Sequence, residues 1–576
     1  MTGAPDTITV EVIGRRLVSV ADEMFATLVR AAYSPNIRER RDCSAGVFDA
    51  DGNLIALSAI GPIHLSSLMG LVDKLTVEFP RDALSPGDCF MTNDPYVGGG
   101  SHLPDITLVS PVFHDGELVA FVANLAHHSD VGGRVPGSES ADCTSIHQEG
   151  LRIPVVRIAR DGELVRDVFA FLALNSRTPR EREGDVRAQL AANRTGCERV
   201  EAVFRTFGAP TVCAAITELL DHAERRVRTA IGSIPDGVYT HEEMLDNDGV
   251  EARLTPMRVA VTVAGDRIRF DFSGTGEQVA GARNMTMLAT LAGVYYAIKA
   301  LLDPDLPVNS GYYRAIDVEA PRGCLLNAEP PAAVGDRAAT GNILGDLIFG
   351  AFAKAIRERA SAGCGPYAGV VASGRDPRNG LYFVDYETFA GASGALHDLD
   401  GRDAVRVHVS GSANLPVEAV EQEYPLAVLR YELLEDSGGA GERRGGLGTR
   451  RDIMALGDDC RLSGRGLRFH QGARGDFGGR PGSVGRFVLH PDTERERPLD
   501  PAFSELALAR GDVIRIETAG GGGYGPPHAR RPDRVLRDVL EGRVSTRAAR
   551  TEYGVEIDGG SIDEAATAVL RTDRDR

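Results

Sequence analysis

Side chains that commonly bind divalent metals are concentrated in one stretch of the sequence, Gly98–Asp130. Histidine nitrogens and carboxylate oxygens, without cysteine, form a mixed ligand set that suits Zn, Mn or Fe(II) and leaves positions open for water or substrate. One group of candidates follows a glycine run, and the other precedes a glycine pair. The five candidate ligands are His102, Asp105, His127, His128 and Asp130.

A β-hairpin would bring these two groups together. Two apolar segments, Ile106–Phe113 and Leu118–Ala126, flank the turn-like sequence His114-Asp115-Gly116-Glu117. Asp-Gly between such segments is a strong hairpin signal. The spacing therefore predicts that the candidate ligands meet at the open end of one hairpin. Two such residues alone would be explained as side chains that cap a loop and face solvent. Five of them between glycine runs favour a metal site.

The hairpin leaves open which histidine shares a face with Asp105. Side chains alternate between the two faces of a strand, so a shift of one residue exchanges them. If the turn has strictly two residues, Asp105 pairs with Ala126, and His128 lies on the face of Asp105. A longer turn or a bulge selects His127 instead.

Composition argues against several classes of function. The chain has 576 residues and a formal net charge of −18, whereas nucleic-acid binding needs basic patches that neutralise phosphates. The sequence starts without a secretory signal, and no apolar run approaches the ~18–20 residues of a membrane span. The eight cysteines are far apart, with no C-x-x-C pair, which is typical of reduced cysteines. We expect a cytoplasmic protein that binds neither nucleic acid nor membrane.

Periodic apolar residues predict helices in both halves of the chain. In Thr7–Tyr33 they recur at helical spacing, and Pro35 marks the end. Further hairpins are expected to turn at Asp51-Gly52 and Ala264-Gly265. The other predicted helices are Pro62–Phe79, Arg180–Cys197, Thr211–Ile231, Thr286–Leu302, Thr340–Arg359, Asp533–Glu541, Ser545–Tyr553 and Ser561–Arg571.

These elements predict a mixed α/β (α+β) protein: a large mixed-sheet domain with β-hairpins and packed helices, and a strand-rich C-terminal half. We expect residues 1–240 to form a metal-bearing region. Residues 241–530 are expected to form a strand-rich core interwoven with it, and residues 531–576 a C-terminal helical tail.

The glycine-rich segments do not match nucleotide-binding motifs. No G-x-x-x-x-G-K-[ST] occurs, and neither Gly438–Gly448 nor Gly520–Gly523 opens a strong helix, as a dinucleotide-binding turn requires. Such segments are more typical of tight turns and of close backbone approach. A serine-triad hydrolase is also unsupported, because the sequence has no G-x-S-x-G.

Several long segments resemble signatures of the hydantoinase B/oxoprolinase family. They stand in the expected order over about Arg38–Tyr553, which is nearly the whole chain. So many ordered motifs are far more specific than a lone glycine pattern. The segments are ERRDCSAGVFDADGNLIAL, GDCFMTNDPYVGGGSHLPDITLVSPVF, LAHHSDVGGRVPGS, EGLRIP, FDFSGTGEQVAGARNMT, TGNILGDLIFGAFAKA, NLPVEAVEQEYPL, DSGGAGERRGGLG and TAGGGGYG.

The resemblance implies one component of a two-component enzyme. The family includes the B-type subunits of ATP-dependent N-methylhydantoinase and caprolactamase, the C-terminal half of 5-oxoprolinase, and equivalent subunits of acetone and acetophenone carboxylases. In these systems ATP is held by a hydantoinase A-type ATPase subunit, which phosphorylates the substrate oxygen. The B-type subunit holds a metal site where the activated carbonyl is attacked. The implied cofactors are a divalent metal (Zn, Mn or Fe) on this chain and ATP on the partner subunit.

The resemblance also implies a ligand set, carried over residue by residue. Asp42, in the motif RRDC, comes from the resemblance alone. The preference for His127 over His128 implies a hairpin turn that is not strictly two-residue. The implied metal ligands are Asp42, His102, Asp105 and His127.

Two neighbouring residues, His128 and Asp130, are then expected to orient the ligands or to handle protons in catalysis. Pro526 stands where the family pattern has an aspartate, which puts a polar role there in doubt. We expect a B-type subunit of an ATP-dependent amidohydrolase that opens a cyclic amide such as a hydantoin, oxoproline or lactam. The alternatives are a subunit of an ATP-dependent ketone carboxylase and a non-catalytic scaffold.

Overall fold

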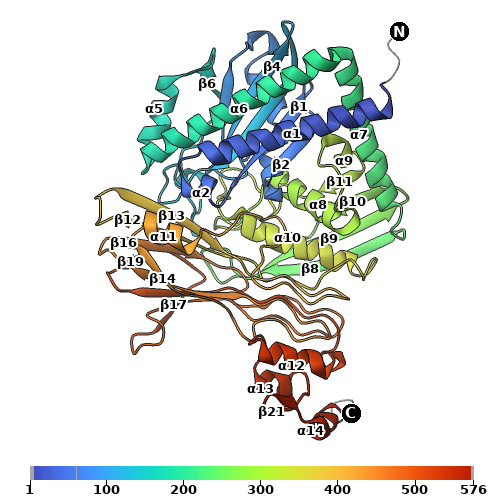
Figure 1. The fold of residues 1–576 in the computed structure, drawn as a ribbon, viewed down its shortest axis with the longest axis vertical. Helices are drawn as coiled ribbons and strands as arrows, with labels where there is room; N and C mark the ends of the chain where they lie inside the picture. Colours follow the sequence, from blue (N-terminus) through green and yellow to red (C-terminus); the bar gives the residue numbers. More distant parts are fainter. Residues whose placement is uncertain (1–4, 60, 573–576) are drawn as a thin grey trace.

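A seven-stranded antiparallel sheet contains the hairpin predicted from the sequence. The structure is a computed structural model that describes residues 5–59 and 61–572. The strands are ordered β2-β1-β5-β4-β3-β6-β7, with the hairpin strands β4 and β5 inside the sheet (Figure 1). Their bounds are β1 Cys43–Asp49, β2 Leu54–Ala59, β3 Cys89–Thr92, β4 Asp105–His114, β5 Glu117–His127, β6 Val156–Arg160 and β7 Glu163–Leu164.

The hairpin turn between β4 and β5 has two residues. His114 pairs with Glu117, so that Asp115 and Gly116 form the turn. Both have positive φ, 51° and 86°, as a type I′ turn requires. The longer turn implied by the family resemblance is therefore wrong.

A β-bulge in the same hairpin supplies the register shift. The pairing slips between Val112 and Phe113, and Val119 is the extra residue on β5. Asp105 consequently pairs with His127. A bulge, and not the turn, therefore determines that His127 lies opposite Asp105.

Three long helices pack against this sheet: α1 (Thr7–Ala31), α6 (Pro179–Phe207) and α7 (Ala209–Ile231) (Figure 1). The Asp6 carboxylate caps α1 by accepting hydrogen bonds from the first backbone amides. The helix predicted for Thr7–Tyr33 begins at Thr7 and ends at Ala31, two residues earlier than predicted. The apolar side chains that predicted it are all buried, namely Ile13, Leu17, Val20, Met24 and Leu28.

The predicted helix Pro62–Phe79 is broken into a 3₁₀ turn (Pro62–His64), α3 (Leu65–Leu68) and α4 (Leu71–Glu78). The break falls at Gly70, whose φ of 69° lies in the left-handed region that favours glycine. The other short helices are α2 (Pro35–Arg38), α5 (Arg166–Leu174), α9 (Ser310–Tyr313) and α11 (Val417–Glu423).

The middle of the chain builds a second sheet with two helices, α8 (Met287–Leu302) and α10 (Arg337–Phe352). Every residue of α10 is buried, so this helix is surrounded by protein on all sides. The largest apolar cluster joins this region to the first sheet. The strands, in the order β11-β10-β9-β8, are β8 Gly237–Leu245, β9 Thr255–Ala264, β10 Arg267–Asp271 and β11 Ile316–Glu319.

The C-terminal half is rich in strands, as predicted. One sheet has the order β13-β12-β16-β19 and the other the order β14-β15-β20-β17-β18. These observations confirm the predicted fold class. The strands are β12 Ala368–Arg375, β13 Tyr382–Phe389, β14 Leu426–Leu433, β15 Thr449–Ala455, β16 Cys460–Arg465, β17 Arg486–Leu489, β18 Arg497–Leu499, β19 Ala502–Leu508 and β20 Val513–Glu517.

The glycine-rich segments lie next to these sheets, where several backbone segments approach one another closely. A Cβ atom on Gly521 would lie 2.0 Å from the carbonyl oxygen of Ser393, and one on Gly445 would lie 1.9 Å from that of Gly521. The glycines therefore permit backbone contact.

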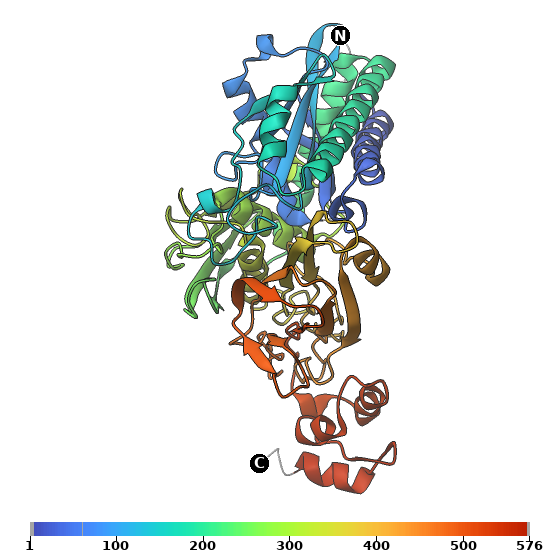
Figure 2. The same cartoon turned by 90° about the vertical axis from the view of Figure 1, so that its left-hand side faces the viewer.

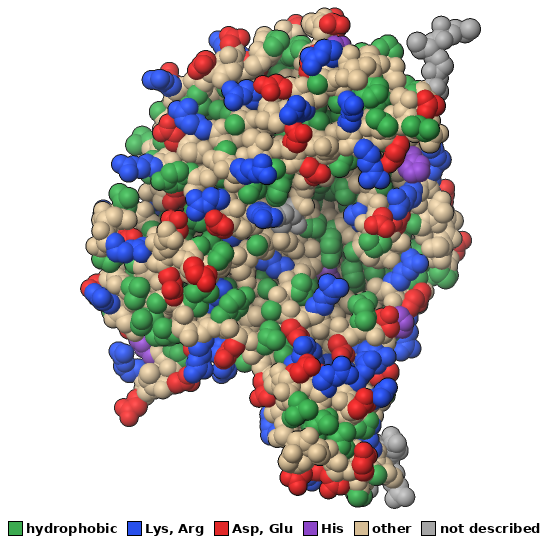
Figure 3. Space-filling view, viewed as in Figure 1, with side chains coloured by type: hydrophobic (Ala, Val, Ile, Leu, Met, Phe, Trp, Pro, Cys, Tyr) green, Lys and Arg blue, Asp and Glu red, His purple; other side chains and the backbone are tan. Residues whose placement is uncertain are grey.

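The end of the chain forms a small lobe at one end of the elongated molecule (Figures 1 and 2). It contains α12 (Pro532–Leu540), α13 (Thr546–Thr551), α14 (Glu564–Thr572) and the hairpin of β21 (Ile557–Asp558) and β22 (Ser561–Ile562). No single described helix is long and apolar enough to cross a membrane; the pair α6 and α7, bent by 108°, reaches that length and composition together. On the face shown in Figure 3, acidic and basic side chains are interspersed.

Candidate metal centre

The open end of the β4–β5 hairpin brings three candidate ligands together. Asp105 begins β4 and His127 ends β5, opposite each other. His102 precedes Asp105 in a tight turn, in which the Asp105 amide donates to the His102 carbonyl at 3.0 Å. Ligand atoms of these three residues all lie within 4.8 Å of one another, and all three side chains are buried. The group is called the ligand triad below.

The facing atoms of the triad form no hydrogen bond in the described structure, although His102 Nε2 lies 3.3 Å from Asp105 Oδ1. These atoms are His102 Nε2, Asp105 Oδ1 and His127 Nε2. Buried polar atoms are almost always satisfied in folded proteins. Two imidazole nitrogens and a carboxylate oxygen, converging and unsatisfied, fit a divalent cation such as Zn, Mn or Fe(II).

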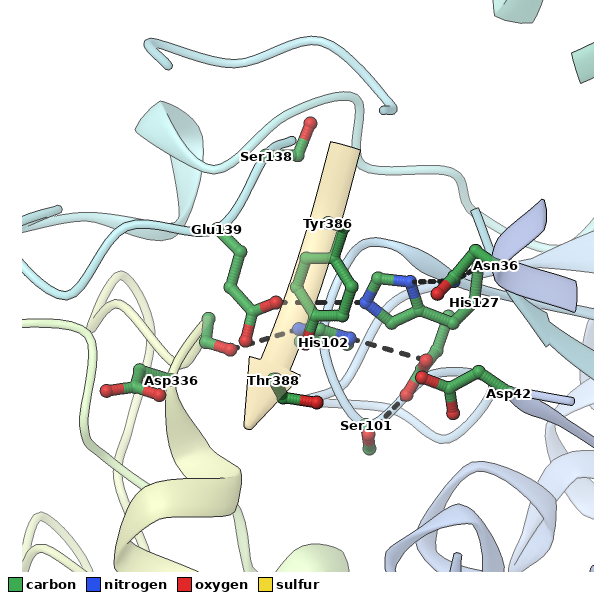
Figure 4. Close-up of polar contacts among 12 residues, drawn as sticks. Asn36, Asp42, Ser101, His102, His127, Ser138, Glu139, Asp336, Tyr386 and Thr388 are labelled. Carbon is green, nitrogen blue, oxygen red and sulfur yellow. Dashed lines mark hydrogen bonds and ion pairs between the residues drawn. The ribbon is translucent and has the colours of Figure 1, made fainter. Parts of the chain in front are cut away.

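Neighbouring groups hold each ligand from behind. His102 Nδ1 lies 3.0 Å from the Gly335 carbonyl, which directs Nε2 towards the triad. Asp105 Oδ2 accepts hydrogen bonds from Ser101 and, at 3.1 Å, from Arg337. Asn36 Nδ2 contacts His127 Nδ1 at 2.9 Å (Figure 4). Contacts of this kind orient metal ligands in proteins.

Burial and charge set the ionisation of these groups. Burial, reinforced by the positive charge of Arg337, lowers the pKa of His102, which favours the neutral, ligating form. Burial alone would raise the pKa of Asp105, but the neighbouring His102 and Arg337 hold it well below its ordinary value. The carboxylate is therefore ionised at neutral pH.

Asp42 lies beside the triad because β1 pairs with β5. Its backbone carbonyl accepts from the His127 amide at 2.9 Å. Its carboxylate contacts His64, with Asp42 Oδ1 3.3 Å from His64 Nε2, while Ser44 Oγ lies 2.7 Å from His64 Nδ1. Burial opposes ionisation of Asp42, yet the hydrogen bond with His64 holds its pKa well below the ordinary value.

Glu139 is a buried carboxylate that sequence reasoning missed. Its Oε2 lies 3.8 Å from His127 Nε2 (Figure 4) and 3.1 Å from Arg465 Nη2. Neither carboxylate oxygen has a hydrogen-bond partner among the described residues. Glu139 stands in a loop with several other acids, so no local signal singled it out.

His128 and Asp130 lie apart from the triad. His128 points towards α6, where its Nε2 is 3.0 Å from Gln189 Oε1. Burial and the charge of Arg182 lower the pKa of His128 to about 3. Asp130 accepts hydrogen bonds on both oxygens from the Gly132, Gly137 and Arg177 amides and from the Arg177 guanidinium. Both residues therefore hold the chain around the hairpin end.

His114, the remaining histidine of this stretch, lies at the opposite end of the hairpin. Its Nδ1 is 3.3 Å from Glu201 Oε1.

A cavity of about 40 Å³ opens next to the candidate ligands. Its wall combines residues from distant parts of the chain, including Asp42, His127, Arg337, Tyr386 and Arg406. A second cavity, of about 320 Å³, is mainly apolar and is hollowed beside α8 (Figure 3). In the segment 61–65, Gly61, Ile63 and His64 line the first cavity, and Pro62 and Leu65 line the second. An apolar space thus adjoins a polar, ligand-bearing one.

The fold and this site define a chain with a candidate centre for a divalent metal, built from the hairpin end and a neighbouring strand. The chain belongs to the hydantoinase B/oxoprolinase family, whose model matches residues 6–527. This confirms the family expected from the sequence motifs.

Individual relatives support this assignment over the whole length. A putative D-/L-hydantoinase B-type subunit of Pseudomonas sp. (strain NS671) is 34% identical, over 98% of each chain. The crystal structure of ATP-dependent caprolactamase from Pseudomonas jessenii has a TM-score of 0.89 at 31% identity, covering 99% of this chain and 100% of that one. Nucleotide-free acetone carboxylase has a TM-score of 0.91 at 20% identity, over 99% and 83% of the chains, and shares the fold.

Proposed function

We propose that this chain is the B-type subunit of an ATP-dependent amidohydrolase that opens a cyclic amide. The observation that carries the proposal is the ligand triad, whose three facing atoms are buried and unsatisfied. Asp42 is proposed as the fourth ligand, beside the triad. A divalent metal held there would supply Lewis-acid catalysis and activate water at neutral pH.

The chain's own residues prepare this chemistry. Arg337 and Ser101 hold Asp105 in place. His64 lines the cavity and can hold a proton at Nε2, next to Asp42. We assign His128 and Asp130 a positioning role, since Asp130 already accepts hydrogen bonds on both oxygens.

The roles of a partner subunit and of ATP are inferred from membership of the family. An amide carbonyl is stabilised by resonance, so opening a small ring is helped by phosphorylation of the carbonyl oxygen. We propose that a hydantoinase A-type ATPase subunit performs this step in the cytoplasm, since the related caprolactamase is described as ATP-dependent. The apolar cavity beside the candidate metal centre suits the hydrocarbon part of a cyclic amide.

Elemental analysis by mass spectrometry tests the metal centre directly. We expect near-stoichiometric Zn, Mn or Fe in the purified protein, and its loss in His102→Ala and Asp42→Ala. His114→Ala is the matched control, because it removes a histidine from the other end of the same hairpin. Normal metal content in folded His102→Ala would contradict the ligand assignment. The reaction itself is tested separately, by an assay of ATP-dependent ring opening with the partner subunit.

A ketone carboxylase subunit is the second candidate, favoured by the fold shared with acetone carboxylase. Bicarbonate-dependent turnover of a ketone, without ring opening of any cyclic amide, would support it.

A further inference from the structure

Arg406 is a cation in the wall of the smaller cavity without a carboxylate partner. Within residues 5–59 and 61–572, no carboxylate oxygen forms an ion pair with its guanidinium within 4.0 Å. Nη1 donates to Ser410 Oγ at 3.0 Å, and Nη2 donates to both the carbonyl and the hydroxyl oxygen of Thr388. Nε has no partner in the described structure, so Nε and the second N–H of Nη1 remain as donors. The side chain is half-buried, and the carboxylates that act on it, Asp42 and Glu387, lie beyond ion-pair distance.

A second arginine places another positive charge next to Arg406. Arg40 also donates to Thr388 Oγ1, at 2.6 Å, so that two guanidinium groups share one hydroxyl. The remaining hydrogen bonds of Arg40 go to neutral oxygens of Asn36, Tyr386 and Ala413. Burial and the charge of Arg40 lower the pKa of Arg406 to about 10.

Two other arginines at the centre, Arg337 and Arg465, differ from Arg406 because they are ion-paired. Arg337 Nη2 lies 3.1 Å from Asp105 Oδ2, and Arg465 lies 3.1 Å from Glu139 and 3.2 Å from Asp336. Arg406 therefore has donor capacity and charge left for a ligand in the cavity.

The position of Arg406 links it to the candidate metal centre. Strand β13 places Tyr386 and Thr388 on one face of the strand, and both line the cavity with Arg406 (Figure 4 shows the two strand residues). The Tyr386 ring centroid is 4.5 Å from that of His127. The cavity, at about 40 Å³, has room for about three water molecules, which is similar to the bulk of a small oxyanion.

We propose that Arg406, with the hydroxyls of Thr388 and Ser410, forms an oxyanion-binding subsite for the substrate. A guanidinium fork matches the paired oxygens of a phosphoryl or carboxylate group. The inference rests on the proposed function, because it takes this cavity as the place where substrate meets the metal centre. In that reaction water attacks the phosphorylated carbonyl carbon, the ring C–N bond breaks with proton transfer to nitrogen, and a second water releases phosphate from the resulting acyl phosphate. Arg406 would hold the phosphoryl oxygens beside the site of attack. A carboxylate on the substrate ring is the other source of the same chemistry.

Isothermal titration calorimetry with inorganic phosphate and with acetate, on the full-length chain depleted of metal, tests the subsite. Metal depletion prevents the anion from binding a metal ion directly. We expect one of the two anions to bind, and its Kd to rise at least tenfold in Arg406→Gln. Arg406→Lys, which keeps the charge but not the fork, should bind with intermediate affinity. Arg461→Gln is the matched control, since Arg461 is exposed on β16, and its Kd should stay within twofold of wild type.

The outcomes separate the two sources and the two proposals. Binding of phosphate assigns the subsite to the phosphoryl group, and binding of acetate alone assigns it to a carboxylate. Binding of neither anion, or equal affinity in Arg406→Gln, overturns the subsite even if metal analysis is positive. If Arg406→Gln does not fold, Ser410→Ala, which frees Nη1, decides instead: unchanged affinity overturns the subsite. If the wild-type chain binds one of the anions but contains no metal, only the proposed function is contradicted.

Discussion

Replacement of Glu139 by glutamine tests whether this buried carboxylate contributes to metal binding. The change keeps the size of the side chain and removes its charge. Glu139 Oε2 is 3.8 Å from His127 Nε2, and neither oxygen has a hydrogen-bond partner in the described chain. Groups that support metal ligands typically change affinity by about 10–100-fold, which corresponds to about 1.4–2.8 kcal/mol. We expect Glu139→Gln to weaken binding of Zn or Mn within this range.

The same substitution affects folding of the metal-free chain. Glu139 is ion-paired with Arg465 at 3.1 Å, and removal of one partner from a buried pair destabilises a protein by about 3–5 kcal/mol. Arg465 keeps Asp336 at 3.2 Å, and glutamine still offers a carbonyl oxygen. We therefore expect a smaller loss, about 1–3 kcal/mol in the free energy of unfolding.

Two assays separate these effects. Competition against a fluorescent metal chelator measures metal affinity, and urea unfolding with EDTA measures the stability of the metal-free chain. Glu329→Gln is the control, because Glu329 forms an exposed ion pair with Arg322. Reduced stability with unchanged metal affinity would show that Glu139 only balances the charge of Arg465, and would refute the role in metal binding.

Two further predictions concern pH and packing. Burial raises the pKa of Glu149 to about 8 from an ordinary value of 4.5, so between these pH values the folded chain keeps a proton that the unfolded chain has lost. Stability from this group is complete below the ordinary pKa and is lost as pH rises to about 8; Glu149→Gln should flatten the decline in urea unfolding between pH 5 and 8, and an equally steep decline would contradict this. A methyl group on Gly521 would lie 2.0 Å from the Ser393 carbonyl oxygen, so Gly521→Ala should lower the unfolding free energy by about 1–3 kcal/mol or more. Gly232→Ala, where the nearest atom is 3.4 Å away, should change it by less than about 0.5 kcal/mol, and equal effects of the two would refute the steric argument.

The local part of the site could be predicted from the sequence. Asp-Gly between apolar segments specifies a hairpin, and a hairpin brings its ends together whatever the rest of the chain does. The meeting of Asp105 with the histidines at the other end followed from this alone. The choice of His127 depends on the bulge at Val119. Val119 is neither glycine nor proline, so the sequence gives no signal of a bulge there.

The other parts of the site depend on contacts between distant segments. Asp42 approaches His127 because β1 pairs with β5, which is a matter of strand order and not of spacing. Glu139 faces the triad from a loop held by Arg465, which lies far later in the chain. Arg406 lies in the cavity because Thr388 and Ser410 bind its guanidinium. No pattern in a single segment encodes such contacts, since each arises only when separate elements pack.

The candidate centre cannot be assigned to one region of the chain. The candidate ligands all precede residue 240, but several of the groups that hold them come from later segments. The Gly335 carbonyl contacts His102 Nδ1, Arg337 holds Asp105, and Tyr386 packs against the ring of His127. A fragment ending near residue 240 would contain every proposed ligand and lack these supports. Residues 1–240 and 241–530 therefore build the candidate centre together: the first part contains all the proposed ligands, and both parts orient them and line the adjoining cavity.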